Sequence, residues 1–186
     1  MLNDIKVFGF WIYLMTDLVI FAVLFATFVV LRHNTYGGPS GHDLFELPSV
    51  FAETMLLLTS SFTCSLVTLA VHRKQKNQII LWILATFALG GGFLALELME
   101  FHHLISTGDS WRRSGFLSAF FTLLGTHGFH ISIGMLWMLV ALVRIWLKPM
   151  SEACISQVYR FAFFWHFLDF VWIFIFSVVY GMGILS

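Results

Sequence analysis

Three histidines lie in stretches of the sequence that are otherwise apolar, where an imidazole ring could bind a haem or a metal ion. His127 and His130 are three residues apart, which places them on one face of a helix, and His166 lies in a later stretch. A haem held between two helices usually takes one histidine from each, at matched depth. The glycines that flank the first pair equally suit close helix contact, so packing is the simpler interpretation of each histidine.

Carboxylates form a second set of residues that could do chemistry, because they can hold and pass protons. Asp17 lies at the middle of an apolar run, where a carboxylate is expected to be protonated or paired. Glu97 and Glu100 share a helix face, Glu53 lies near the start of another run, and Asp169 lies in the last one. For each acid, proton transfer and hydrogen bonding that fixes helix packing are the two hypotheses.

The sequence contains few of the residue spacings that are typical of metal sites. Glu100 and His103 have the Glu-x-x-His spacing of di-iron bundles, but such a site needs a second pair and two further glutamates. The two cysteines, Cys64 and Cys154, form neither a Cys-x-x-Cys motif nor a disulfide framework. We therefore predict that this chain holds no cofactor or metal of its own.

The elements that carry these residues are predicted to be membrane-spanning helices. Of the 186 residues, 59% are hydrophobic and 11% are charged, with a mean hydropathy of +0.89, whereas soluble domains have about 25% charged residues. A net charge of zero gives no indication of nucleic-acid binding. A helix needs about 20 apolar residues to cross a bilayer. Five runs are long enough: 7–31, 48–71, 79–99, 116–147 and 161–185.

These runs predict an all-α integral membrane bundle that forms a single domain over residues 1–186, because the connectors are too short for a soluble domain. Lysine and arginine favour the cytoplasmic side of a membrane. Three of them, Arg32, Arg112 and Arg113, fall on one side. The other seven fall on the side of the N-terminus: Lys6, Arg73, Lys74, Lys76, Arg144, Lys148 and Arg160. We expect a bacterial inner-membrane protein with a cytoplasmic N-terminus and a periplasmic C-terminus.

Four stretches carry a resemblance to a known family. Residues 125–134, Gly-Thr-His-Gly-Phe-His-Ile-Ser-Ile-Gly, resemble a GxHGxHV signature, and residues 165–173, Trp-His-Phe-Leu-Asp-Phe-Val-Trp-Ile, resemble a WHFxDxVW helix. Residues 11–21 and 48–63 resemble two further shared helices. On these stretches the chain resembles subunit III of the haem-copper terminal oxidases over essentially its full length.

Within this family the chain most resembles the quinol-oxidase branch of the cytochrome bo type. The cytochrome c branch typically has seven helices in this subunit, and the quinol branch has five. Residues 45–48 and 114–121 resemble the ubiquinol-oxidase version. Asp17 stands where cytochrome c oxidases usually have glutamate, and the quinol branch commonly has aspartate there. Subunit III of a cytochrome c oxidase is the alternative.

The resemblance implies a non-catalytic accessory subunit of a proton-pumping oxidase. Subunit I would hold the haems, the copper and the quinol site, and this chain would stabilise it, bind phospholipid and support proton uptake. Arg144 lies fourteen residues after His130, as does the family arginine that binds a lipid phosphate. A snorkelling arginine that contributes to topology alone is the alternative. The other candidate lipid-binding or structural residues are His127, His130, Trp165, His166 and Asp169.

Two other classes of function remain as hypotheses. An electron-transfer cytochrome would use His127, His130 and His166 as haem ligands. A proton-coupled carrier would use Asp17, Glu97 and Asp169, but carriers often show internal repeats. The odd number of helices and the lack of a repeat weigh against a carrier.

Overall fold

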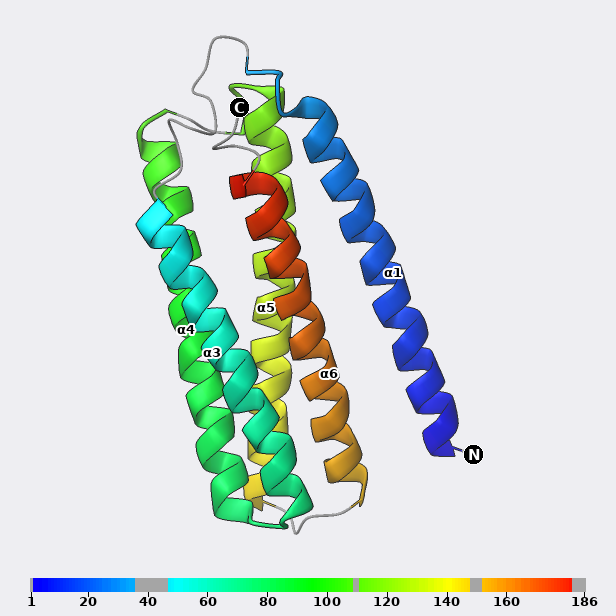
Figure 1. The fold of residues 1–186 in the computed structure, drawn as a ribbon. Coiled ribbons are helices and arrows are strands. Elements are labelled where there is room, and N and C mark those ends of the chain that lie inside the picture. The colour runs from blue at the N-terminus through cyan, green and yellow to red at the C-terminus, as the bar shows by residue number, and fades with distance from the viewer. Residues whose placement is uncertain (1, 36–46, 109–110, 148–151, 182–186) are drawn as a thin grey trace.

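The computed structural model describes residues 2–35, 47–108, 111–147 and 152–181, and their regular secondary structure is entirely helical. Five helices among them are long and apolar enough to cross a membrane, which confirms the predicted all-α membrane bundle. A π-helical turn, η1, directly continues the last helix. The elements are α1 (Leu2–Leu31), α3 (Leu47–His72), α4 (Lys76–Ser106), α5 (Gly115–Leu147), α6 (Glu152–Ile175) and η1 (Phe176–Tyr180) (Figure 1).

Helix bounds differ from the predicted ranges where charged residues lie near helix ends. α4 runs from Lys76 to Ser106, beyond the predicted 79–99, and α6 begins at Glu152 rather than at 161. The predictions followed apolar runs alone, whereas a helical backbone satisfies its own hydrogen bonds and continues into the headgroup region. The predicted end of the last helix, 182–185, lies outside the described residues.

Short connectors make sequential helices antiparallel (Figure 1). The turn between α3 and α4 closes with Lys74 in the left-handed region, at φ 54°. Ser114 caps α5, because its Oγ accepts a hydrogen bond from the backbone N–H of Leu117 at 3.1 Å. The turn and the cap help to determine which helix ends lie side by side. They thereby help to determine which side chains lie at the same depth in the bundle.

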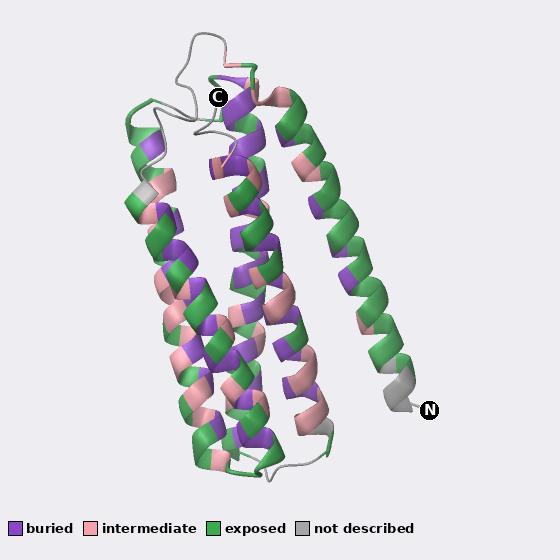
Figure 2. Cartoon of the chain, viewed as in Figure 1, coloured by how far each residue is buried: buried purple, intermediate pink, exposed green. Residues whose placement is uncertain are grey.

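The helix α1 lies at the edge of the bundle and leans away from the other helices toward its N-terminal end (Figure 1). It packs mainly against α5 and to a lesser extent against α6, while α3 and α4 form the most extensive pair. Burial follows this arrangement: purple residues line the interior of the bundle, and most of α1 is exposed (Figure 2). Large apolar side chains make up much of the exposed surface, which suits lipid or other membrane helices.

Candidate functional site

Asp17 and His130 face each other where α1 packs on α5. Oδ1 of Asp17 is 3.6 Å from Nε2 of His130, and 4% and 8% of these residues are exposed. The other ring nitrogen, Nδ1, donates to the carbonyl oxygen of Thr126 at 2.7 Å. The Nε2 atom of His130 therefore points to the Asp17 carboxylate, and the two polar side chains meet at the contact of α1 and α5.

His127 has a different setting from His130. It is fully buried, and its ring stacks on Trp172 with the ring centroids 5.4 Å apart. Phe21 and Phe93 contact other parts of the same ring. Neither ring nitrogen has a hydrogen-bond partner within the described part of the chain. Aromatic side chains from α1, α4 and α6 therefore surround the ring.

Glu53 and Glu97 are buried acids at the end of the bundle opposite the chain's N-terminus. Glu53 lies near the start of α3, and Glu97 lies near the end of α4. They are 0% and 1% exposed, and their carboxylate oxygens make no hydrogen bond to any described residue. Both interact electrostatically with Glu100, and the buried Tyr180 of η1 lies near all three acids. Such a cluster in a low-dielectric interior is a place where protons can be held.

Gly128 on α5 makes room for the Glu97 carboxylate. A Cβ atom at position 128 would lie 2.5 Å from Oε2 of Glu97 and 3.1 Å from its Cδ. The Glu97 carboxylate from α4 therefore occupies the space that a Cβ atom at position 128 would need. This contact explains why the last position of the Gly-x-His-Gly stretch, residue 128, is a glycine.

Trp165 fills the space where three other helices converge on α6. Its indole Nε1 donates to Oγ of Ser60 on α3 at 3.1 Å. A Cβ at Gly90 on α4 would lie 2.8 Å from the ring atom Cη2, and one at Gly134 on α5 would lie 3.1 Å from Cζ3. The indole ring is therefore held between two glycines and a serine, and it ties α6 to the rest of the bundle.

His166 and Asp169 lie on the face of α6 that meets α3. Nδ1 of His166 is 2.7 Å from Oγ of Ser61, and Nε2 is 3.4 Å from Oγ of Ser65. Asp169 lies within electrostatic range of His166, and both are half-buried. The structure thus brings these two predicted residues together with two serines.

Two arginines lie near the membrane surface at the end of the bundle where the N-terminus lies. Arg144 is exposed, and its Nη1 donates to Oε1 of Gln157 on α6 at 2.9 Å. Arg160 is half-buried, and its Nη1 donates to Oγ of Ser156 at 2.6 Å. Gln157 was not among the predicted residues. A single amide side chain just before an apolar run could have indicated a polar contact there.

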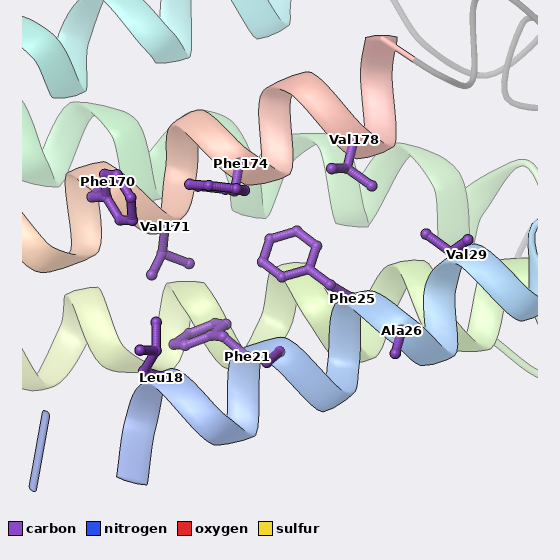
Figure 3. Close-up of a pocket in the computed structure, with 10 residues that line it drawn as sticks. Leu18, Phe21, Phe25, Ala26, Val29, Phe170, Val171, Phe174 and Val178 are labelled. Carbon is purple, nitrogen blue, oxygen red and sulfur yellow. The ribbon is translucent and has the colours of Figure 1, made fainter. Parts of the chain in front are cut away.

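Two grooves follow the seam between α1 and α6. The first, of about 330 Å³, lies along the C-terminal half of α1, and apolar side chains from both helices line it (Figure 3). The second, of about 340 Å³, lies near the N-terminal ends of both helices, and Arg160 and Glu152 contribute to its wall together with aromatic side chains such as Phe10 and Trp11. Apolar side chains make up most of the lining of both grooves.

The predicted residues do not converge on a single centre. His127 is enclosed by aromatic rings, His130 faces Asp17, and His166 faces two serines. In the described ranges, no three histidine, cysteine, aspartate or glutamate side chains gather as metal ligands. His103, the partner of Glu100 in the Glu-x-x-His pair, is exposed near the end of α4. This arrangement suits helix connection and proton holding within a membrane bundle.

Comparisons with known proteins match the chain over nearly its full length. The model of the cytochrome c oxidase subunit III family matches residues 3–184. Subunit 3 of the cytochrome bo(3) ubiquinol oxidase of Pseudomonas aeruginosa is 54% identical over 96% of this chain and 86% of its own length. The corresponding subunit of Pseudomonas putida is 47% identical over 98% and 88%. A cytochrome c oxidase subunit 3 from a Bacillus species is 43% identical over 97% and 87%.

Proposed function

The chain belongs to the cytochrome c oxidase subunit III family, and from this membership we propose that it is the non-catalytic third subunit of a haem-copper ubiquinol oxidase. The observation that carries the proposal is the similarity to ubiquinol oxidase subunits along almost the entire chain. Because the similar protein from a Bacillus species is named as a cytochrome c oxidase subunit, the third subunit of a cytochrome c oxidase is the second candidate function.

The settings of the three histidines support placing the redox centres in a partner subunit. A haem ligand must offer a free ring nitrogen beside an open slot. His127 is closed in by aromatic rings, and the nitrogens of His130 and His166 are engaged by groups of this chain. These residues do not fit a haem. The oxidase's haems and copper, together with its quinol site, would lie in subunit I.

A role in phospholipid binding is supported by the seam between α1 and α6. One groove of the seam is apolar throughout, and the other combines apolar walls with Arg160 near the membrane surface. An acyl chain fits the apolar walls, and a guanidinium pairs a phosphate in two hydrogen bonds. Arg144 lies at the same end of the bundle and keeps further N–H donors beyond the one directed at Gln157.

A role in proton uptake is supported by Asp17 and His130, two proton-binding side chains whose polar atoms lie 3.6 Å apart at the contact of α1 and α5. Such a pair can accept and return a proton without leaving an isolated charge in the membrane. It would act as a buffer beside the proton pathway of the catalytic subunit. The reaction with quinol and oxygen would take place elsewhere in the complex.

The orientation proposed is a cytoplasmic N-terminus and a periplasmic C-terminus in a bacterial inner membrane. The turn between α3 and α4 lies at the same end of the bundle as the N-terminus (Figure 1). It carries Arg73 and Lys74, and Lys76 is the first residue of α4. Clustered positive charge favours the cytoplasmic side. Accessibility of a cysteine placed at Lys74 to an impermeant reagent, in spheroplasts and in inverted vesicles, tests this orientation.

The experiment that tests the function compares the purified oxidase with and without this chain. We expect the haem absorption bands to be unchanged when the chain is deleted, while the activity decays over fewer turnovers. Loss of a haem band would contradict a non-catalytic role. Quinol and cytochrome c, supplied in turn as electron donors, separate the two candidate oxidases.

A further inference from the structure

A polar patch lies at the membrane centre on the outer surface of this chain. It consists of Ser61 and Ser65 on α3 with His166 and Asp169 on α6, and is called here the mid-membrane patch. Ser65 is exposed, and the other three residues are half-buried. Ser61 is one residue from the middle of the span Pro48–His72, and His166 is one residue from the middle of Cys154–Tyr180. The patch therefore lies where lipid would be purely hydrocarbon.

The hydrogen bonds within the patch are directional. Ser65 donates its hydroxyl hydrogen to the carbonyl oxygen of Ser61 at 3.1 Å, so Nε2 of His166 must donate to Oγ of Ser65. Nδ1 lies 2.7 Å from Oγ of Ser61, and Ser61 also hydrogen-bonds to Asp169. This chain of bonds leaves lone pairs on both serines at a partly exposed surface. Oδ1 of Asp169 has no hydrogen-bond partner within the described residues.

An exposed polar group at the centre of a bilayer costs several kcal/mol unless protein or water covers it. Asp17, Glu53, Glu97, His127 and His130 avoid that cost because they are buried inside this chain. The mid-membrane patch is not covered in this way. In the membrane something else must cover it, and lipid tails offer no hydrogen bonds.

The surroundings of the patch indicate the kind of partner. Leu58, Phe62 and Leu69 are exposed at helical spacing on either side of Ser65, so a polar centre has apolar flanks. Ser61 and Ser65 are four residues apart, a spacing of small residues that lets helices approach closely in membranes. Apolar flanks, small residues and unused hydrogen-bond capacity together match the surface of a transmembrane helix contact.

We propose that the mid-membrane patch is the docking surface for a transmembrane helix of another oxidase subunit, one that carries a hydrogen-bonding side chain at mid-depth. That side chain donates to the free lone pairs of the serines or to Asp169, and the flanking apolar residues pack on the same helix. The inference rests on the proposed function, because it requires that the chain work within a complex.

The first test exchanges Ser65 for leucine in the complete oxidase. A larger apolar side chain suits a lipid-facing position but collides with a docked helix, so we expect loss of most of this chain from the purified complex. Thr59→Leu is the matched control: Thr59 is also exposed on α3, and its hydroxyl donates to the carbonyl oxygen of Met55 at 2.7 Å. Equal retention of the two variants, whether both stay or both are lost, would overturn the proposal.

The second test does not depend on how well the Ser65 variant folds. A photo-crosslinking phenylalanine analogue at Phe62, which is 65% exposed, keeps an aromatic side chain beside the patch. We expect a covalent adduct with another oxidase subunit in native membranes, and adducts with lipid alone would overturn the proposal. If the unmodified chain is absent from the purified oxidase, the proposed function itself fails. If it is present without the adduct, this inference alone fails.

Discussion

The carboxylate Oδ1 of Asp17 lies 3.6 Å from Nε2 of His130 and joins the outlying helix α1 to α5 by a polar contact inside the membrane. Polar contacts between membrane helices are worth about 1 kcal/mol each. Since α1 packs less extensively against the bundle than the other helices do, a loss of this size should weaken its attachment to α5.

Asp17→Asn should leave assembly of the oxidase intact, because an amide of nearly the same shape keeps a polar group beside His130. Asp17→Leu removes the contact and leaves the ring nitrogen unpaired, which should cost about 1–2 kcal/mol and reduce recovery of the chain in the purified complex. Thr16→Val is the control, because the Thr16 hydroxyl donates only to the Tyr13 carbonyl of its own helix at 2.7 Å. If Asp17→Asn also prevented assembly, the residue would be structural rather than part of proton uptake.

Gly90→Ala should destabilise the bundle, because the new Cβ would lie 2.8 Å from the rigid indole of Trp165. Overpacking of this kind typically costs about 1–3 kcal/mol, offset by about 1 kcal/mol of helix propensity. Gly91→Ala is the matched control, because its Cβ would lie 3.5 Å from the flexible Met135 side chain. The midpoint of unfolding of the purified complex in a denaturing detergent measures the difference.

A double variant checks that the indole is the cause of this loss. Phenylalanine at position 165 lacks the ring atoms that the new Cβ of Gly90→Ala would meet, so Trp165→Phe should cost less in the Gly90→Ala background than in the native chain. The destabilisation of the double variant should therefore be smaller than the sum of the destabilisations of the two single variants. Strict additivity would mean that Gly90 acts through something other than Trp165.

His127→Leu should leave the haem content of the oxidase unchanged. The substitution removes two buried ring nitrogens that lack hydrogen-bond partners in the described structure, and this gain offsets the lost stacking on Trp172. We expect a stability change within about 1 kcal/mol. Reduced-minus-oxidised difference spectra and the unfolding midpoint measure the two quantities. A missing haem band in this variant would revive the cytochrome hypothesis.

The lengths of the apolar runs were enough to predict five membrane helices, because a bilayer imposes one length on every span. The contacts between polar side chains of different helices could not be predicted by a comparable rule. The sequence marks Asp17 as a residue that needs a partner, but the choice of His130 over His127 depends on how α1 is rotated against α5. His166 was predicted as a candidate residue from its apolar setting and from the family resemblance of residues 165–173. Its partners Ser61 and Ser65 were not predicted, because serine is common in membrane helices and its presence does not indicate which helix face it lies on.

Arg160→Ala should lower the amount of phospholipid that remains bound to the purified oxidase. Arg160 lies in the wall of the groove between the N-terminal ends of α1 and α6, near the depth of lipid phosphates, and its Nη1 is already oriented by Ser156. Arg144→Ala should act in the same direction, because Gln157 on α6, the helix that carries Arg160, orients the Arg144 guanidinium.

Arg73→Ala is the control for these two variants, because Arg73 is exposed at the α3–α4 turn and is absent from the residues that line either groove. Phosphorus per haem after extensive detergent washing measures the bound lipid. A guanidinium at the bilayer surface attracts anionic headgroups whatever its position, so a general charge effect would lower lipid equally in all three variants. Selective loss in Arg160→Ala and Arg144→Ala requires a phosphate held at a defined site. Unchanged lipid in both would leave these arginines with the topological role of keeping one end of the bundle in the cytoplasm.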